Sequence, residues 1–560
     1  MSSFSAYFAL DAYSTHNKLM GRQKNGEHFL QALADRAMLN AQNPETIWAG
    51  FEAQAPQSLR QLLLNAGFRG RLRWHPVLKP GGMEKIGVLY YPAPPTLDLA
   101  CLRASSAPGS CSLMGLTHTL SSAGALDQIR ALALPPFESW DALICTSKAA
   151  RELVKRVIDT AKDEFSRSTG ATRFPSIQLP IIPLGVQASR FQPNQQRRQR
   201  ARDRWSLSPS DFVALFVGRL TFHAKANPAP MYQALQALAK SVPARRVICL
   251  ESGQFPNVGI KGAFEAAQQG IAPDVVFITV DGKDADQFQA AWSAADVFLS
   301  CSDNVQETFG LTPLEAMAAE LPVVVSDWNG YKDTVVDQQT GFRIPTYLPA
   351  PGCRAGETLA VRHAMQVDTY DFYIGRVSMT TVIDPERLQA VLIDLAMRPE
   401  FARAIGKQAR AHVLAHFDWS VIVPQYEALA IELQSRRLAA VGKNPRLLVS
   451  QPWSQRPDPF ALFSHFATAP IDPLTEIKWH PDAAQRWESI KQLSMVRYGF
   501  NPELGDDATM AVLIEASATM HRVADGLVRF RSHDQDAAMR MIMLAAKLDL
   551  CRFKNPSRAT

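Results

Sequence analysis

Two glutamates, Glu307 and Glu315, stand eight positions apart in the stretch from Ser302 to Thr334, SDNVQETFGLTPLEAMAAELPVVVSDWNGYKDT. The stretch follows a strand-like run, DVFLSCS, and continues into an amphipathic helix pattern. A helix that starts just after a strand points its free N–H groups and the positive end of its dipole into the connecting loop. The pattern therefore predicts a phosphate-attracting site at the carboxyl end of a strand, beside two carboxylates.

The start of this helix is predicted from a capping pattern. Thr312 can cap the helix, Pro313 suits its first position, and Glu315 falls three residues after the cap, as in a capping box. In a structural interpretation, Glu315 caps its helix and Glu307 is a solvated loop carboxylate. In a functional interpretation both carboxylates contact a ligand, and capping by Glu315 does not exclude that contact.

Two cations follow an apolar run earlier in the same half of the chain. The run FVALFVG ends at Gly218, and a loop with Arg219 and Lys225 leads to Pro228 and a helix. An arginine and a lysine that flank a strand-to-helix loop can neutralise a diphosphate through charge-assisted hydrogen bonds. Taken alone, two such residues are also common surface charges.

These motifs, in this order, resemble the family 4 glycosyltransferases, enzymes of GT-B fold that retain anomeric configuration. The resemblance rests on Gly218-Arg219, Lys225 and E-TFGLTPL-E, followed by EAMAAELPVVVSD, and extends over about residues 5 to 435. One departure concerns the lysine. The family commonly has Lys-Gly, whereas Lys225 precedes Ala226-Asn227-Pro228, which leaves the backbone geometry after the lysine open.

The resemblance implies a role for each of these residues. Glu315 would hydrogen-bond the ribose hydroxyls of the donor nucleotide, and Glu307 would hold hydroxyls of the donor sugar. Arg219 and Lys225 would stabilise the departing diphosphate together with N–H groups near the helix start. The expected catalytic residues are His118, Arg219, Lys225 and Glu307. The expected contacts to the donor nucleotide are Gly21, Gly218, Arg219, Lys225, Phe309, Gly310, Leu311, Thr312 and Glu315.

The first half of the chain supplies two of these candidates. SAYFALDAY is predicted to be the first strand, and a loop with Gly21 and Gly26 leads from it into an amphipathic helix. The resemblance implies that this loop approaches the donor phosphates, although a tight turn explains two glycines equally well. His118 ends a later strand in MGLTHT and is either a structural histidine or, by resemblance, a neighbour of the donor sugar.

Alternating strands and helices predict an α/β protein with doubly wound sheets, and the resemblance specifies two Rossmann-like GT-B domains that face a cleft. We expect an acceptor-side domain at 1–186, a nucleotide-sugar-binding domain at 187–415, and a helix at 416–440 that crosses back to the first domain. Residues 441–560 are predicted to form a small, mainly helical, winged-helix-like extension. Its near-neutral charge argues against nucleic-acid binding.

Composition narrows the class of protein. A chain of 560 residues with 47% hydrophobic and 20% charged residues suits a globular protein of two or three domains. Seven cysteines without a C-x2-C pair argue against a disulfide framework or a structural zinc site and favour the cytoplasm. The N-terminus does not read as a signal peptide, and no apolar run is long enough for a transmembrane helix.

Charged segments are given less specific interpretations. The net charge is +6, and the arginine-rich segment RRQRARDRW reads as one short helix. It is either a solvated helix face or a surface for an anionic membrane or a polyanionic acceptor. Asp281, Asp284 and Asp286 are interpreted as loop residues, and no metal site is predicted.

The sequence therefore predicts a retaining, hexosyl-type glycosyltransferase that is metal-independent and has no bound cofactor. Its donor would be a nucleotide-diphosphate sugar, and its acceptor a glycan, a lipid-linked sugar, a protein or a small molecule. Peripheral association with the inner face of the membrane fits such an acceptor. Alternatives are a nucleotide-sugar epimerase or sugar phosphorylase, a catalytically inactive glycan- or nucleotide-binding protein, and an interaction module built on the extension. The donor base, the sugar and the oligomeric state stay open.

Overall fold

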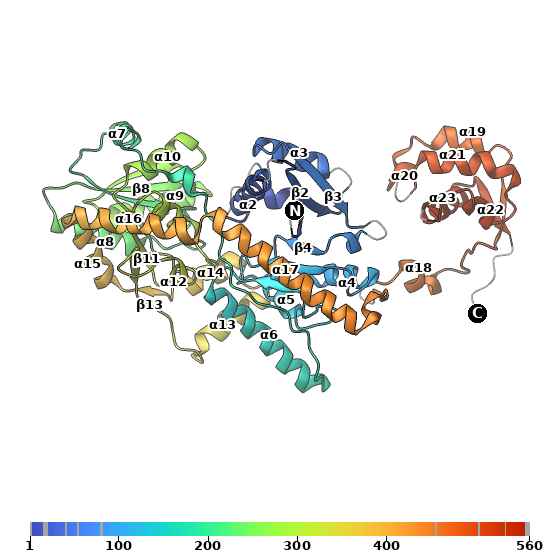
Figure 1. Ribbon diagram of the computed structural model, residues 1–560, viewed down its shortest axis with the longest axis horizontal. Helices are drawn as coiled ribbons and strands as arrows, with labels where there is room; N and C mark the ends of the chain where they lie inside the picture. The colour runs from blue at the N-terminus through green and yellow to red at the C-terminus, as the bar shows by residue number, and fades with distance from the viewer. Residues whose placement is uncertain are drawn as a thin grey trace. The chain divides into compact units, whose positions relative to one another are not determined.

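The computed structural model describes residues 3–14, 21–39, 42–52, 55–78, 82–453, 456–501, 505–532 and 534–554. The chain divides into two compact units, Met1–Trp453 and Ser454–Thr560. The first unit contains two Rossmann-like domains, and the second is a smaller, mainly helical unit (Figure 1).

The first domain is built on a six-stranded parallel sheet with the order β3-β2-β1-β4-β5-β6. This is the doubly wound Rossmann order, in which the order of the strands reverses between β1 and β4. The strands are β1 (Ser5–Tyr7), β2 (Glu45–Gly50), β3 (Arg71–Pro76), β4 (Val88–Tyr91), β5 (Ser112–Leu116) and β6 (Ala142–Ile144). The helical segments are α1 (Leu10–Tyr13), α2 (Gly21–Met38), α3 (Ala55–Asn65), η1 (Met83–Lys85), α4 (Leu97–Ser106), α5 (Ala123–Ala131) and α6 (Lys148–Thr169).

The second domain repeats this topology with the order β12-β11-β10-β7-β8-β9, again parallel throughout. Its strands are β7 (Phe212–Val217), β8 (Val247–Gly253), β9 (Val276–Asp281), β10 (Val297–Ser300), β11 (Val323–Ser326) and β12 (Gly341–Ile344). Its helical segments are η2 (Ala188–Phe191), α7 (Gln195–Arg204), α8 (Ala229–Ser241), α9 (Val258–Ile271), α10 (Ala285–Ala294), α11 (Leu311–Ala318), α12 (Tyr331–Thr334), α15 (Pro385–Met397) and α16 (Pro399–His416). Two such domains in one chain confirm the predicted GT-B fold.

The apolar runs of the sequence become the central strands. All six residues of β7, FVALFV, and all four of β10, VFLS, are buried. Strands of a parallel sheet are covered by helices on both faces, which is why these runs show no alternation of apolar and polar residues. The polar loops that follow β7 and β10 consequently emerge side by side at the carboxyl edge of the sheet, where the paired strands end.

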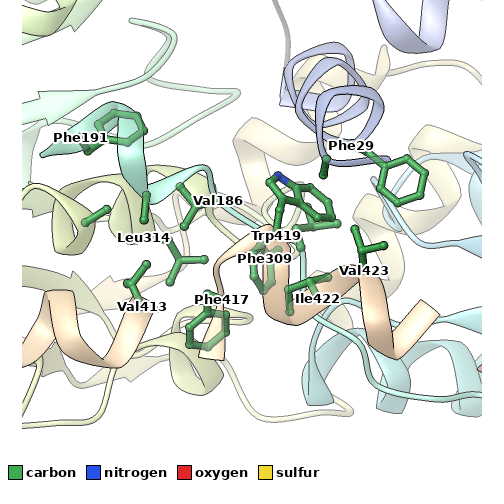
Figure 2. Close-up of a cluster of buried hydrophobic side chains, with 14 of the residues drawn as sticks. Phe29, Val186, Phe191, Phe309, Leu314, Val413, Phe417, Trp419, Ile422 and Val423 are labelled. Carbon is green, nitrogen blue, oxygen red and sulfur yellow. The ribbon is translucent and has the colours of Figure 1, made fainter. Parts of the chain in front are cut away.

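Two segments of the chain connect the domains, and they lie against each other near Val186 and Trp419. Val186 donates its N–H to Phe417 O and accepts from Trp419 N, and Gly185 lies directly under the Trp419 indole, where a Cβ would come within 2.3 Å of the ring. Helix α17 (Trp419–Lys443) then packs against α2 and the strands β4 and β5 of the first domain. Figure 2 shows Trp419 with Phe29 of α2 in one buried cluster. A helix therefore crosses back over the first domain.

A helical hairpin, α13 (Arg354–Ala364) and α14 (Tyr370–Ser378), occupies much of the long connection after β12. It is bounded by the short antiparallel pair β13 (Thr346–Tyr347) and β14 (Val382–Ile383). Helix α14 packs closely on the loop after β7, because a Cβ on Gly375 would lie 2.9 Å from His223 Cβ. We call residues 354–378 the α13–α14 hairpin.

The second unit is mainly helical, as predicted, with a single antiparallel pair of strands among its described residues. The strands are β15 (Glu476–Trp479) and β16 (Cys551–Lys554). The core of this unit includes Trp487, Met510 and Ile542. Its helical segments are α18 (Pro459–Leu462), η4 (Ser464–Phe466), α19 (Ala483–Ile490), α20 (Ser494–Arg497), α21 (Asp507–Ala516), η5 (Ser517–Thr519), α22 (Val523–Leu527) and α23 (Gln535–Lys547). A turn, η3 (Pro445–Leu448), precedes this unit. Across the described ranges, none of the helices combines the length and the apolarity that a membrane span requires.

Two local predictions were wrong. The first strand ends at Tyr7, because Leu10–Tyr13 turn into the short helix α1. Gly21 and Gly26 lie within α2 rather than in a loop, and residues 15–20 of the predicted loop lie outside the described residues. Gly26 is needed for packing, since a Cβ there would lie 1.9 Å from Ala12 O. Gly21 is exposed, and a Cβ there would meet no atom of the described residues within 4 Å.

Candidate functional site

An ion pair between Lys225 and Glu307 lies at the carboxyl edge of the second sheet. Lys225 Nζ donates to Glu307 Oε2 at 2.6 Å, and both side chains are less than one-fifth exposed. Burial disfavours both charged forms, but the opposite charge and the hydrogen bond outweigh it. The pKa of Lys225 is therefore raised and that of Glu307 lowered, so that both groups stay charged near neutral pH.

Arg219 is exposed at the same edge and is held by two acceptors. Its Nη2 donates to Ala224 O at 3.1 Å and to Gln306 Oε1 at 2.7 Å. Because Gln306 precedes Glu307 in sequence, the two predicted cations are each tied to neighbouring residues of the loop after β10. The two loops therefore present one positive and partly neutralised surface.

The backbone after Lys225 is held by Asp303, a residue that the sequence motif does not include. Asn227 N lies 3.3 Å from Asp303 Oδ2 and donates to that carboxylate, while Asn227 Oδ1 accepts from Ala229 N at 3.0 Å. Asp303 is buried, and burial raises its pKa to about 7. This arrangement settles the geometry that the missing Lys-Gly pair left open.

The start of α11 differs from the predicted capping box. The helix begins at Leu311 with Gly310 at the N-cap, and no side chain caps it. Gly310 has φ 94°, and a Cβ there would lie 2.0 Å from the Tyr331 ring, so both conformation and space require glycine. Thr312 lies inside the helix, and its Oγ1 is buried without a hydrogen-bond partner among the described residues.

Phe309 does not present its side chain to the site. It is 2% exposed and belongs to the buried cluster with Trp419 and Ile422, as Figure 2 shows. Its backbone N–H points to Glu307 Oε1 at 3.4 Å. Phe309 therefore anchors the loop, and only its backbone groups are available to a ligand.

Glu315 is 1% exposed on α11 and faces the first domain. Lys24 Nζ, from α2, lies 2.7 Å from Glu315 Oε1, although its geometry is not that of a hydrogen bond. Neither carboxylate oxygen accepts a hydrogen bond from the described part of the chain. Glu315 thus has a charge partner from across the domain boundary and unused acceptor capacity.

His118 lies just after β5 in the first domain. Its Nε2 is 2.9 Å from Pro92 O, and because a carbonyl can only accept, Nε2 carries the proton. Burial and the positive charge of Arg22 lower the His118 pKa to about 4, although the hydrogen bond to Pro92 opposes them. The ring is therefore neutral at physiological pH, with Nδ1 as an acceptor.

The first domain meets the second along this same edge. Ser147, at the N-cap of α6, donates to Thr308 O at 3.0 Å, beside Glu307. Lys148 N donates to Asp333 Oδ2 at 2.6 Å. Because Thr117 and Thr146 also adjoin each other at the ends of β5 and β6, the segment with His118 lies on the edge that faces the loop after β10.

Four residues of this site were missed by motif reasoning, namely Lys24, Asp303, Gln306 and Tyr370. Lys24 follows Gly21 by three positions, and a basic glycine-containing segment was the available signal. Asp303 and Gln306 lie within the glutamate stretch but match no part of the motif. Tyr370 lies in the α13–α14 hairpin, and its hydroxyl is 2.7 Å from Ser121 Oγ, a contact that sequence spacing does not reveal.

A cavity of about 1160 Å³ lies elsewhere, at the opposite edge of the second sheet. Its lining includes Arg198, Arg202 and Arg245. These arginines are engaged within the protein: Arg198 pairs with Asp296 at 2.5 Å, and Arg202 and Arg245 donate to backbone carbonyls. The arginine-rich helix α7 is therefore partly a packing element rather than only a solvated face.

Among the described residues, acidic and thiol side chains do not gather into a metal site. In the ranges that the structure describes, no group of three or more His, Cys, Asp or Glu side chains could hold a metal ion. Asp284 instead caps α10 by accepting from Asp286 N and Gln287 N, and Asp286 lies in the first turn of that helix. Asp281 is the last residue of β9, so the interpretation of these three aspartates as loop residues was wrong.

Part of the second domain matches a known family. Residues 197–350 match the model described as Glycosyl transferases group 1. The match includes Arg219, Lys225 and both glutamates, and it ends before the α13–α14 hairpin. The fold and the site thus define a two-domain GT-B protein whose second domain carries the pattern of this family.

Curated relatives resemble parts of the chain. A GDP-mannose-dependent alpha-(1-6)-phosphatidylinositol monomannoside mannosyltransferase of Mycolicibacterium smegmatis is 30% identical over 223 residues, 38% of this chain and 56% of the relative. A D-inositol 3-phosphate glycosyltransferase of Segniliparus rotundus is 24% identical over 243 residues, 43% of this chain and 44% of the relative. The chain therefore spans about half the length of the curated relatives that it matches.

Among solved structures, Anabaena HepE in complex with UDP aligns with a TM-score of 0.48 at 16% identity. The alignment covers 78% of this chain and 100% of the HepE chain.

Proposed function

We propose that the cleft between the two Rossmann-like domains binds a nucleotide-diphosphate sugar, and that the protein transfers the sugar to an acceptor hydroxyl. Arg219 and Lys225 would contact the diphosphate, Glu315 the ribose hydroxyls and Glu307 the donor sugar. His118 would accept a hydrogen bond from the sugar through Nδ1. Backbone groups of Gly21, Gly218 and residues 309–311, with Thr312 Oγ1, would complete the donor contacts.

One observation carries this proposal. Arg219 and Lys225 follow β7, Glu307 follows β10, and contacts join these residues at one sheet edge. Opposite them stand Ser147 and Lys24 of the first domain. Ligands of doubly wound folds bind outside the carboxyl ends of the strands, and a diphosphate needs the positive charge that this edge offers.

The chemistry follows from the charges. The bond between the anomeric carbon and the β-phosphate oxygen breaks, and its electron pair leaves with the diphosphate. Arg219 and Lys225 lower the energy of that developing charge. The acceptor oxygen bonds to the anomeric carbon, and its proton goes to the departing phosphate.

We further propose retention of configuration and independence from metal. Glu307 is engaged by Lys225, which leaves it poorly suited as a covalent nucleophile, and reaction on one face of the sugar accords with this restraint. The cations supply the charge that a metal ion would otherwise provide. Seven cysteines, of which six are buried, suit the cytoplasm as the site of the reaction.

The test is an assay of turnover with UDP-, GDP-, ADP- and TDP-sugars, with and without EDTA, in the presence of glycan and lipid-linked acceptors. Release of one nucleoside diphosphate with formation of an EDTA-insensitive α-linked product from an α-linked donor supports the proposal. Product stereochemistry is read from the anomeric coupling in NMR spectra. An epimerised donor, or a requirement for inorganic phosphate in place of an acceptor, would replace transfer by epimerase or phosphorylase chemistry.

A further inference from the structure

We infer that Tyr370 of the α13–α14 hairpin is a positioning residue for Arg219 and, through it, for the diphosphate of the donor. The inference rests on the proposed function and adds a residue from outside the matched family segment, 197–350.

A chain of hydrogen bonds joins Arg219 to the first domain. Arg219 Nη2 donates to Gln306 Oε1 at 2.7 Å, and Gln306 Nε2 donates to Tyr370 Oη at 3.3 Å. Tyr370 Oη is in turn 2.7 Å from Ser121 Oγ, three residues after His118. The chain of bonds therefore runs from the candidate diphosphate site, through the hairpin, to Ser121 of the first domain.

The direction of the first two bonds in this chain is determined. A guanidinium can only donate, so the amide oxygen of Gln306 must face Arg219 and its NH2 group must face Tyr370. Tyr370 Oη accepts that N–H. Between Tyr370 Oη and Ser121 Oγ either hydroxyl can donate. Loss of the Tyr370 hydroxyl therefore removes the acceptor that orients the Gln306 amide.

The hairpin holds Tyr370 firmly at the first position of α14. Asp368 is 4% exposed and pairs with both Arg362 and Arg376, which fixes the turn between the two helices. Thr369 caps α14 by accepting from Phe372 N. These local restraints place the tyrosine ring before any ligand arrives.

The far end of α14 fixes the hairpin against the loop after β7. Gly375 allows close contact with His223, and Asn227 Nδ2 lies 3.5 Å from Met379 Sδ. The hairpin therefore covers the loop that carries Arg219 and Lys225, and Tyr370 is placed relative to that loop rather than free in solvent.

Because Tyr370 holds Arg219 in place, loss of its hydroxyl should weaken the binding of some ligands and not of others. Arg219 is an exposed, long side chain, and holding it in one geometry before binding reduces the entropy lost when it meets a diphosphate. The effect should appear only for ligands that Arg219 contacts. Loss of the Tyr370 hydroxyl should weaken the binding of a nucleoside diphosphate. It should not change the binding of the matching nucleoside monophosphate, which lacks the outer phosphate.

The test uses the full chain and isothermal titration with the nucleoside diphosphate that binds best and with its monophosphate. Tyr370→Phe should weaken diphosphate binding about 3- to 10-fold, the range of one lost hydrogen bond, and leave monophosphate binding unchanged. Tyr373→Phe is the matched control, since that ring stacks on His363 at 4.6 Å and lies outside the hydrogen-bond chain. Gln306→Leu should reproduce the Tyr370→Phe result.

Coupling to Arg219 is measured by combining the substitutions. Tyr370→Phe should have no further effect on diphosphate binding in an Arg219→Ala background. Equal weakening of monophosphate and diphosphate, or full additivity with Arg219→Ala, would overturn the inference. If the unaltered protein binds no nucleotide, the proposed function falls with it; if it binds normally and Tyr370→Phe binds equally well, only the role of Tyr370 falls.

Discussion

Lys24 of α2 places its ammonium 2.7 Å from the carboxylate of Glu315 on α11, and this ion pair joins the two Rossmann-like domains at the candidate nucleotide site. A ribose hydroxyl that donates to Glu315 Oε1 would compete with Lys24 for that oxygen. Lys24→Met should therefore tighten nucleoside diphosphate binding about two- to fivefold, the scale of one partly exposed ion pair, as measured by isothermal titration near pH 7.5.

Lys148→Met is the control for this prediction. Lys148 Nζ also forms an inter-domain pair, at 3.5 Å from Asp333, but it does not touch Glu315. Nucleotide affinity should be unchanged in this variant. Weaker binding by Lys24→Met would show instead that Lys24 is a direct ligand, and equal gains in both variants would point to general loosening of the domains.

Removing only one charge of the Lys225–Glu307 ion pair should destabilise the protein more than removing both charges. Lys225→Met leaves a mostly buried carboxylate without its cation and should lower the free energy of unfolding by about 1–3 kcal/mol. Lys225→Met with Glu307→Gln should recover part of that loss, because the uncompensated charge is removed. Urea unfolding of both variants measures the difference, and a double variant less stable than the single one would contradict it.

His118 should act as a neutral hydrogen-bond acceptor rather than as a titrating acid or base. Since its pKa is about 4, it stays uncharged from about pH 5.5 to 8.5. His118→Ala should lower turnover about 5- to 10-fold, the scale of one hydrogen bond, by the same factor at every pH in that range. A ratio of wild-type to variant rates that changes about tenfold across the range would show that His118 titrates.

Asp303 makes stability depend on pH in a defined direction. Its folded pKa, about 7, lies above the usual aspartate pKa of 3.8, so the native state binds the extra proton between these values. Stability contributed by the protonated form is therefore lost as pH rises through about 7, with a slope of up to about 1.4 kcal/mol per pH unit.

Asp303→Asn removes this ionisation while keeping a side chain of similar shape. The variant should gain stability relative to the unaltered protein as the pH is raised from about 5 to 7, as measured by urea unfolding at several pH values. Glu138 and Glu251, whose pKa values burial also raises to about 7, remain in both proteins and cancel in the comparison. Parallel stability profiles would contradict the burial of a protonated Asp303.

Local sequence predicted the sheets because short continuous apolar runs such as FVALFV are typical of central strands in a covered parallel sheet. It also indicated the crossing at Val186, where proline and glycine exclude a helix. It failed at α11, because the capping box at Thr312 competes with Gly310, whose positive φ and contact with Tyr331 start the helix earlier. Tertiary packing, which the capping pattern does not contain, decided that boundary.

The candidate site was predictable only where its residues share a local motif. Arg219 and Lys225 lie on one loop, and Glu307 and Glu315 on one strand-to-helix segment. Lys24 and Tyr370 lie 291 and 55 positions from Glu315 in the sequence. The packing of α2 and of the α13–α14 hairpin brings them to the same site. Contacts between distant elements of this kind have no signature in spacing.

Equilibrium binding of nucleotides tests the central claim most directly. We would titrate the full chain with UDP, GDP, ADP and TDP and follow thermal unfolding, with Lys225→Met as the comparison. One nucleotide should raise the melting temperature, corresponding to about 2.7 kcal/mol at 100 times its dissociation constant, and Lys225→Met should abolish most of the shift. Absence of a shift with all four nucleotides, or a shift of the same size in Lys225→Met, would contradict a diphosphate site at Arg219 and Lys225.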